Sequence, residues 1–261
     1  MRSAGLLVVV AGCGFHSSAA SSPPIEDAAP TMPGDDAGGV LPDALVPDAA
    51  RSTFCAIDGI VACFEFEGSV TDGSGNALQT TASGVSFVHN GELGMAMQLD
   101  DNSSATVKPT ILDDVEAVTI EAWIRPTRRP DGGEQFNILD VDQQYAFTIN
   151  DDGTLTCDLH PNPGKLSTTG PAGTVATNQW THVACTYDGI NTSRIYINGL
   201  AAATRSASGT LGKGGHGIGI AQNYPGGSQL IGLIDQLRLL NVARSAGDIC
   251  TDSGGTLCIS L

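Results

Sequence analysis

The sequence has little positive charge and no long apolar run. Its 261 residues contain 12 Lys and Arg against 28 Asp and Glu, which gives a formal net charge of −16 at pH 7. A nucleic-acid-binding protein needs a basic surface to neutralise phosphates, so this composition excludes nucleic acid as a partner. No stretch approaches the roughly 18 apolar residues of a membrane-spanning helix, so attachment to a membrane would require something other than a spanning helix.

Aromatic residues are also scarce, at 5%, whereas 33 glycines and 13 prolines predict many turns and few long helices. The Cys-x-x-Cys spacing of zinc sites is absent, and so is the G-x-S-x-G turn of serine hydrolases. A G-x-G-x-x-G match at 212–217 has no helix pattern after it, so dinucleotide binding is not expected. The seven cysteines therefore indicate disulfides formed in an oxidising compartment.

Residues 1–12 are typical of a signal peptide, with one arginine before a short apolar stretch. The next residue completes the sequence VAGC, which resembles the lipobox of bacterial lipoproteins. That resemblance implies cleavage before Cys13, a lipid on Cys13, and sorting to the outer membrane because residue 14 is not Asp. The alternative is an ordinary secreted protein in which Cys13 is incidental. Removal of Cys13 leaves six cysteines, an even number, which favours the lipoprotein.

Residues 13–51 form a linker that begins with the lipidated cysteine. Six prolines and six acidic residues are mixed there with Ala and Ser. Such a segment buries too little apolar surface to offset its ordering entropy, so it is predicted to be disordered. At about 3 Å per residue, an extended spacer of this length could reach roughly 100 Å. A stalk is the preferred interpretation, and a targeting or recognition peptide is the alternative.

Residues 52–261 show short alternating segments separated by turn residues. Tyr145, Phe147 and Ile149 share one face of a predicted strand, and the Asp-Gly pair at 152–153 then predicts a hairpin turn. The Asn-Gly pair at 198–199 is a second hairpin signal. Only residues 242–249 suggest a helix. This pattern predicts an all-β fold of antiparallel strands, a β-sandwich or a jelly roll, with a short C-terminal helix.

Several of these segments carry a family resemblance. They read VTIEAWIRP at 118–126, WTHVACTYDG at 180–189, IYING at 195–199, GLIDQLRL at 232–239, NVARS at 241–245 and DGSGN at 72–76. Together they cover about residues 59–249 and resemble, in order, the LamG-like jellyroll family of the concanavalin A-like superfamily. The resemblance implies an antiparallel two-sheet jelly-roll sandwich that is usually a recognition module, sometimes with calcium.

Six cysteines remain after Cys13, and they allow 15 pairings. Two pairs are each separated by eight residues, one at the domain start and one at its end. The family pattern tends to place the strands of the middle two cysteines side by side, which implies that these two pair. The favoured set is Cys55–Cys63, Cys157–Cys185 and Cys250–Cys258. The alternative is crossing between the end pairs, because the termini of a jelly roll often meet.

A calcium site is predicted from the loop at 72–76. Asp72 and Asn76 offer closely spaced hard oxygens, which calcium prefers, and Asp235 on a late strand is the expected distant ligand. The loop is not an EF-hand, because position 12 would be Ser83. The alternative is a plain turn held by its own side-chain hydrogen bonds.

Tyr224 is the candidate ligand-binding aromatic. It lies in a glycine-containing loop at 221–227, and sugar-binding jelly rolls often stack a sugar ring on an exposed aromatic. The alternative is that Tyr224 anchors its own loop by packing.

Catalysis is not expected, so the chain is predicted not to be an enzyme. Retaining glycosidases of the superfamily carry Glu-x-Asp-x-x-Glu, and the nearest stretch, 140–145, lacks both glutamates. The sequence therefore predicts a lipid-anchored extracytoplasmic recognition or adhesion module that binds a glycan or protein partner through rim loops. The alternatives are an envelope structural protein without a discrete ligand and a divergent glycoside hydrolase.

Overall fold

The structure is a computed structural model that describes residues 53–162, 164–206, 208–213, 215–256 and 258. The predicted signal peptide (1–12), Cys13 and the linker to residue 51 lie outside these residues, so the expectations about them stay predictions. Within the described part of the chain, no helix is long and apolar enough to cross a membrane.

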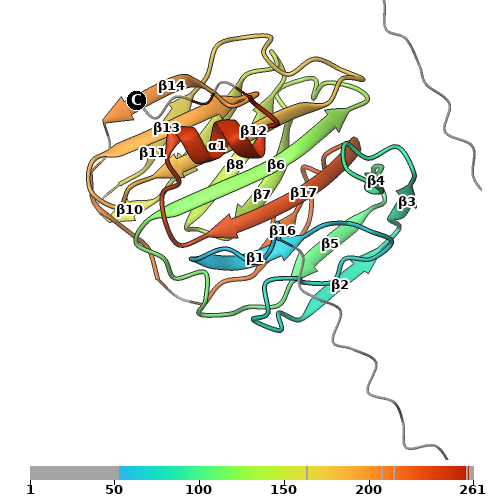
Figure 1. Cartoon of the computed structure of the whole chain (residues 1–261), viewed down its shortest axis with the longest axis horizontal. Helices are drawn as coiled ribbons and strands as arrows, with labels where there is room; N and C mark the ends of the chain where they lie inside the picture. The colour runs from blue at the N-terminus through green and yellow to red at the C-terminus, as the bar shows by residue number, and fades with distance from the viewer. Residues whose placement is uncertain (1–52, 163, 207, 214, 257, 259–261) are drawn as a thin grey trace, which may run out of the picture. The chain divides into compact units, whose positions relative to one another are not determined.

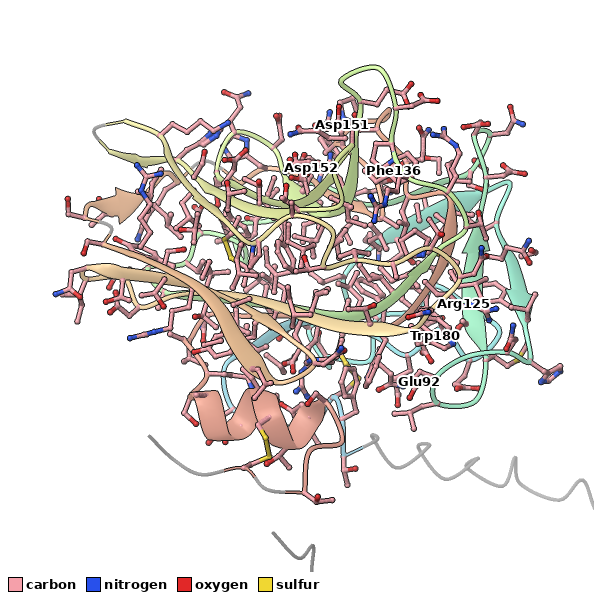
Figure 2. The ribbon with its side chains drawn as sticks, turned by 90° about the horizontal axis from the view of Figure 1, so that it is seen from above. Glu92, Arg125, Phe136, Asp151, Asp152 and Trp180 are labelled. Atoms are coloured by element: carbon pink, nitrogen blue, oxygen red, sulfur yellow. A yellow bond between two sulfur atoms is a disulfide. The ribbon has the colours of Figure 1, made fainter. Side chains whose placement is uncertain are left out.

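Two antiparallel sheets pack face to face (Figures 1 and 2). The first has eight strands: β1 (Ile60–Phe64), β3 (Ser86–Val88), β4 (Ala96–Leu99), β6 (Val118–Pro126), β12 (Thr181–Tyr187), β13 (Thr192–Ile197), β14 (Leu200–Ser206) and β17 (Gly232–Leu240). The second has seven: β2 (Thr80–Ser83), β5 (Ser104–Val107), β7 (Gln135–Val141), β8 (Tyr145–Asn150), β9 (Leu155–Leu159), β11 (Leu166–Thr169) and β16 (Ile218–Ile220). The predicted all-β jelly-roll sandwich is confirmed.

The order of strands shows which segments become neighbours. The eight-stranded sheet runs β14–β13–β12–β6–β17–β4–β3, and β1 also pairs with β17. The seven-stranded sheet runs β11–β9–β8–β7–β16–β5–β2. A separate two-stranded piece joins β10 (Pro161–Asn162) to β15 (Thr210–Leu211). Strands distant in the sequence are therefore adjacent in both sheets.

The core lies between the sheets and follows the alternation of the sequence. In β8, Tyr145, Phe147 and Ile149 are buried, as predicted. In the partner sheet, Ile120 and Ile124 of β6 are fully buried and belong to the same cluster. Each large apolar side chain removed from water in this way contributes about 1.5–3 kcal/mol. The residues between them, such as Thr148, point to the opposite face of the strand.

The predicted hairpin turns are present. Asn198 and Gly199 connect β13 to β14 with φ values of 48° and 78°, the positive pair that a two-residue hairpin turn requires. Gly199 is needed for space as well, because a Cβ there would lie 2.3 Å from the Ser253 hydroxyl oxygen. Between β8 and β9, Gly153 has a φ of 76°.

Three disulfides join the cysteine pairs that the sequence favours: Cys55–Cys63, Cys157–Cys185 and Cys250–Cys258. The expected placement of the middle pair is wrong, however. Cys157 lies on β9 of the seven-stranded sheet and Cys185 on β12 of the other sheet, so their strands are not neighbours. This disulfide crosses the core and links the two layers, with both residues fully buried.

The single helix of the described residues, α1 (Ala246–Asp252), lies on the outer face of the eight-stranded sheet (Figures 1 and 2). It begins four residues later than the sequence suggested. Ser245 is the N-cap residue: its hydroxyl accepts a hydrogen bond from Asp248 N at 3.1 Å, and Asp248 Oδ2 accepts one from Ser245 N at 3.2 Å. This capping box fixes the start of the helix. Ile249 then packs on Ala184 and Tyr196.

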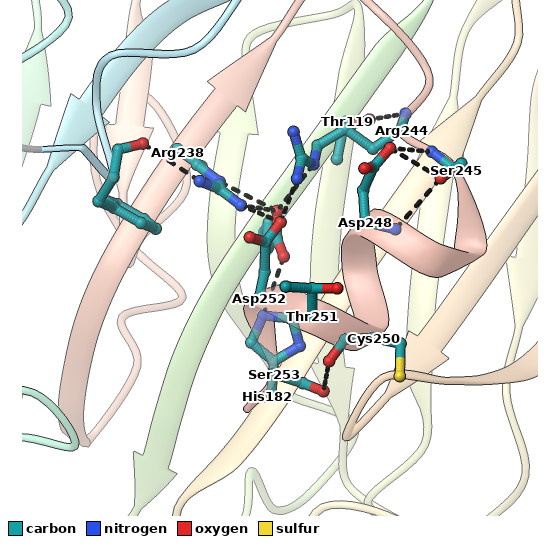
Figure 3. Close-up of polar contacts among 12 residues, drawn as sticks. Thr119, His182, Arg238, Arg244, Ser245, Asp248, Cys250, Thr251, Asp252 and Ser253 are labelled. Atoms are coloured by element: carbon teal, nitrogen blue, oxygen red, sulfur yellow. Dashed lines mark hydrogen bonds and ion pairs between the residues drawn. The ribbon is translucent and has the colours of Figure 1, made fainter. Parts of the chain in front are cut away.

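A buried charge network lies beside α1 (Figure 3). Arg238 of β17 and Glu121 of β6 are each 1% exposed, and Arg238 Nε and Nη2 donate to Glu121 Oε2 at 3.0 and 2.9 Å. Glu121 Oε1 is 3.0 Å from His182 Nε2. Asp252, in the last turn of α1, pairs with both Arg238 and Arg244. The ion pair between Asp252 and Arg238 therefore connects α1 to the eight-stranded sheet.

Candidate ligand-binding face

The outer face of the seven-stranded sheet is polar. Thr148 of β8 is paired with Asn137 of β7 on one side and with Thr156 of β9 on the other, and Thr156 is paired with Thr169 of β11. Paired residues in adjacent strands point to the same face. Small polar side chains from four strands therefore form rows across this face.

Five polar side chains at this sheet form a hydrogen-bonded network that branches at Asn150. Gln135 Nε2 donates to Asn150 Oδ1 at 2.7 Å, and Asn150 Nδ2 donates to the hydroxyls of Thr154 and Thr156 at 2.6 and 2.8 Å. The hydroxyls of Thr156 and Thr169 are 3.2 Å apart. We name Gln135, Asn150, Thr154, Thr156 and Thr169 the polar row. Since every member is hydrogen-bonded to at least one other, their geometry is fixed before a ligand arrives.

A groove follows the polar row. All five side chains line an open hollow of about 380 Å³, which Gly133, Glu134, Asp151 and Asp152 complete. Ligand sites typically occupy about 300–1,000 Å³. A smaller hollow of about 130 Å³ adjoins it and shares Glu134 and Gln135. We call the two hollows together the groove. Figure 2 shows Asp151 and Asp152 on the side of the sandwich away from α1.

The smaller hollow contains a positioned arginine. The guanidinium of Arg128 lies 4.9 Å from the centre of the Phe136 ring, and it is 3.4 Å from Asp101 and 3.6 Å from Glu134. Phe136 is only 2% exposed, so its ring packs against the Arg128 guanidinium and offers little surface to a ligand. Arg128 supplies hydrogen-bond donors to the groove at this end.

The larger hollow is acidic at its edge. Glu134, Asp151 and Asp152 are exposed there. The hydrogen bonds that Thr154 donates lower the pKa of Asp152, so its carboxylate is ionised at neutral pH. The groove therefore combines neutral amides and hydroxyls along its floor with negative charge at its edge, which disfavours anionic ligands.

Tyr224 lies at the other end of β7. Its backbone N donates to Asp140 Oδ2 at 2.9 Å, and burial raises the pKa of Asp140 to about 6. The ring packs on Gly217 so closely that a Cβ there would lie 2.1 Å from a ring carbon. Five residues of strand, roughly 17 Å, separate Asp140 from Gln135, so Tyr224 is not part of the groove. The ring is half-buried, and a ligand-binding role for it stays a prediction.

Asp72 and Asn76, two of the predicted calcium ligands, form a hydrogen-bonded turn. Asp72 Oδ1 accepts from Cys63 N at 3.1 Å and Ser74 N at 2.9 Å, and Asp72 Oδ2 accepts from the Ser74 hydroxyl at 2.7 Å and Leu78 N at 3.2 Å. Asn76 directs its amide nitrogen to two carbonyls of β1 at 3.1 and 2.9 Å. Both side chains thus have protein partners.

Asp235, the third predicted ligand, has different neighbours. Its Oδ2 accepts from Leu93 N at 2.9 Å, and burial raises its pKa to about 7. Within the residues that the structure describes, no hydrogen bond or ion pair connects Asp235 to Asp72 or Asn76. Among the described residues, no group of three or more His, Cys, Asp or Glu side chains is placed to hold a metal ion. Calcium at Asp72, Asn76 and Asp235 stays a prediction.

The polar row is not among the site residues predicted from the sequence. The sequence contained part of the signal, because the polar Thr154 and Thr156 alternate with the apolar Leu155 and Cys157. The pairing of that strand with β8 and β11 comes from the fold, so the sequence could not show that these hydroxyls meet Asn150.

Comparisons with known proteins agree with this architecture. Residues 99–250 match the family described as the concanavalin A-like lectin/glucanases superfamily. The binding domain of Paraclostridial Mosquitocidal Protein 1 superposes with a TM-score of 0.62 at 19% identity, over 75% of this chain and 52% of that chain. The receptor binding domain of botulinum neurotoxin D gives 0.61 at 16% identity, over 76% and 52%. The chain thus spans about half the length of both domains.

Another similar structure is domain 4 of AbnA, a GH43 extracellular arabinanase from Geobacillus stearothermophilus, in complex with arabinotriose. It superposes with a TM-score of 0.59 at 20% identity, over 74% of this chain and 97% of that domain. No curated protein matches the chain in sequence. Because the family match covers more than half of the 261 residues, and the fold is the two-sheet sandwich described above, this chain belongs to the concanavalin A-like lectin/glucanase superfamily.

Proposed function

We propose that the protein is an exported, lipid-anchored binding module, and that its groove binds a neutral glycan. The polar row carries this proposal. A sugar presents hydroxyls that both donate and accept hydrogen bonds, and the row offers amide and hydroxyl groups of both kinds from four adjacent strands. Their mutual hydrogen bonds hold them in place, which reduces the entropy lost on binding.

The similar structures support a binding role. Domain 4 of AbnA was solved with arabinotriose, and the chain covers 97% of that domain. At 20% identity this likeness concerns the fold, so the identity of the sugar is left to experiment. The two toxin domains are described as binding or receptor-binding domains, which fits the same class of function.

A non-catalytic role is part of the proposal. Of the acids in 140–145, Asp140 is 8% exposed and accepts a hydrogen bond from Tyr224 N. Hydrolysis of a glycosidic bond needs two carboxyl groups that face one sugar. Asp140 is covered by the loop that carries Tyr224, which disfavours it for that task.

A protein partner is the second candidate. Ile111 is 76% exposed and Leu112 is 43% exposed, side by side in the segment before β6. Contiguous exposed apolar surface can mark a protein-contact site. This surface lies outside the groove, so it would bind its partner separately.

The groove predicts a specific loss of binding. In a glycan array with the exported chain carrying Cys13→Ala to keep it in solution, we expect a neutral oligosaccharide to bind. Thr156→Val keeps the shape of the side chain but removes its hydroxyl, and we expect it to weaken binding about tenfold, equivalent to about 1.4 kcal/mol. Calorimetric titration measures this change.

The matched control is Thr204→Val, which removes an exposed hydroxyl from β14 on the other sheet. We expect this variant to bind as the wild type does. Equal binding by Thr156→Val and wild type would contradict the groove, and the absence of any bound glycan would contradict the proposed ligand class.

Membrane attachment is tested separately. Cys13→Ala removes the thiol that would carry the lipid, and we expect the protein to move from the membrane fraction to the soluble exported fraction. The three disulfides of the described domain support export, because they form in oxidising compartments. A Cys13→Ala protein that stays in the membrane fraction would show that its attachment does not depend on a lipid at Cys13.

A further inference from the structure

Asp113 has a carboxylate buried without partners. It lies in the segment that leads into β6, it is 0% exposed, and neither of its oxygens has a hydrogen-bond partner among the described residues. A buried charge is costly unless it is paired or binds a metal. Two free oxygens on one fully buried side chain therefore need an explanation.

Gln144, in the turn between β7 and β8, adds a third such oxygen. Gln144 is also 0% exposed, and its Nε2 donates to Asp114 Oδ1 at 2.8 Å. The Oε1 of the same amide group has no partner in the described part of the chain. The amide group of Gln144 is thus held beside Asp114, the chain neighbour of Asp113, with its oxygen unused.

Several contacts bring these segments together. Gly215 N lies 3.4 Å from Asp114 Oδ1, and Tyr145, the residue after Gln144, donates its hydroxyl to the Asp113 carbonyl at 3.1 Å. Thr110 N donates to His216 O at 3.1 Å. These contacts therefore bring three segments, at 110–115, 144–145 and 215–216, together beside Asp113 and Asp114.

We propose that these oxygens bind a divalent cation, with calcium the best fit, through Asp113 and Gln144 Oε1 and with the charge of Asp114 beside them. Carboxylate and amide oxygens are the hard ligands that calcium prefers. This site differs in every residue from the one predicted at Asp72, Asn76 and Asp235. A bound cation would hold the 110–115 segment, which carries the exposed Ile111 and Leu112, against the β7–β8 turn.

Protonation of Asp113 is the competing explanation. Burial, followed by the charge of Asp114, raises the pKa of Asp113 to about 7, so a neutral acid is available near neutral pH. A proton removes the buried charge, but both carboxyl oxygens still lack a hydrogen-bond partner among the described residues. A cation satisfies both Asp113 oxygens and the Gln144 oxygen together.

Thermal melting of the exported chain carrying Cys13→Ala distinguishes the two accounts. At neutral pH, calcium well above its dissociation constant should raise the Tm by about 5–10 °C over the Tm in chelator. Asp113→Asn should abolish this shift, while Asp235→Asn should keep it. Gln144→Glu adds a charged ligand, and its calcium shift should exceed that of the wild type, which also provides a test if Asp113→Asn does not fold.

Three results would overturn the site. The first is a wild type without a calcium shift. The second is a shift that survives Asp113→Asn and disappears in Asp235→Asn, which would move the cation to the other predicted site. The third is a Gln144→Glu variant that is less stable than the wild type and insensitive to calcium, as protonation alone predicts.

Discussion

Replacing Arg238 by alanine is expected to lower the free energy of unfolding by about 3–5 kcal/mol. Arg238 is 1% exposed, and its guanidinium donates to Glu121 Oε2 twice and to Phe54 O at 3.1 Å. The Phe54 ring lies 4.4 Å from the guanidinium carbon. Truncation removes all these contacts and leaves Glu121 buried with less compensation.

The protonation state of Glu121 makes this loss large. Burial alone would raise its pKa, but the hydrogen bond and charge of His182 and the charge of Arg238 lower the pKa below its ordinary value. Glu121 is therefore an ionised carboxylate in the protein interior. Without Arg238 it must keep a costly buried charge or take up a proton.

Denaturant unfolding of Arg238→Ala measures this effect. The matched control is Lys108→Ala, which removes an exposed cation and should change the free energy of unfolding by less than about 0.5 kcal/mol. A loss below about 1 kcal/mol for Arg238→Ala would mean that the network beside α1 is open to water, contrary to its burial.

Removing the disulfide between the sheets is expected to have the second largest effect. Cys157 and Cys185 are 28 residues apart, and the chain-entropy model assigns about 3.6 kcal/mol to such a loop. Both cysteines are fully buried, so the change of each to alanine also removes packing in the core. We expect the double variant Cys157→Ala/Cys185→Ala to lose at least this amount.

The comparison is the double variant Cys250→Ala/Cys258→Ala. Its cysteines are eight residues apart, for which the same model gives about 2.6 kcal/mol. Urea unfolding of both variants gives the two losses. A larger loss for the terminal pair would contradict the account, and so would free thiols at Cys157 and Cys185 in peptide mapping of the wild type.

Local patterns predicted the fold class well because they depend on near neighbours in the chain. The alternation of Tyr145, Phe147 and Ile149 showed a strand with one buried face, and Asn198–Gly199 showed the turn that follows β13. The helix start was predicted less accurately, because the 242–249 pattern did not distinguish the Ser245 capping box from helical residues before it.

Non-local partners could not be predicted in the same way. Arg238 and Glu121 are 117 residues apart in sequence, and their pairing follows from the adjacency of β6 and β17. The polar row and the buried oxygens of Asp113 and Gln144 likewise depend on which strands and turns become neighbours. A single sequence contains these residue types but not their pairing.

We have proposed that the groove over the polar row is the ligand site. The most direct measurement is a titration of the ¹⁵N-labelled protein, carrying Cys13→Ala, with the oligosaccharide that binds best on the array, followed by NMR chemical shifts. We predict that the largest changes occur at the side-chain amides of Gln135 and Asn150 and at the backbone amides of Thr154, Thr156 and Thr169. Changes confined to the loop of Tyr224, with the polar row unaffected, would contradict the claim.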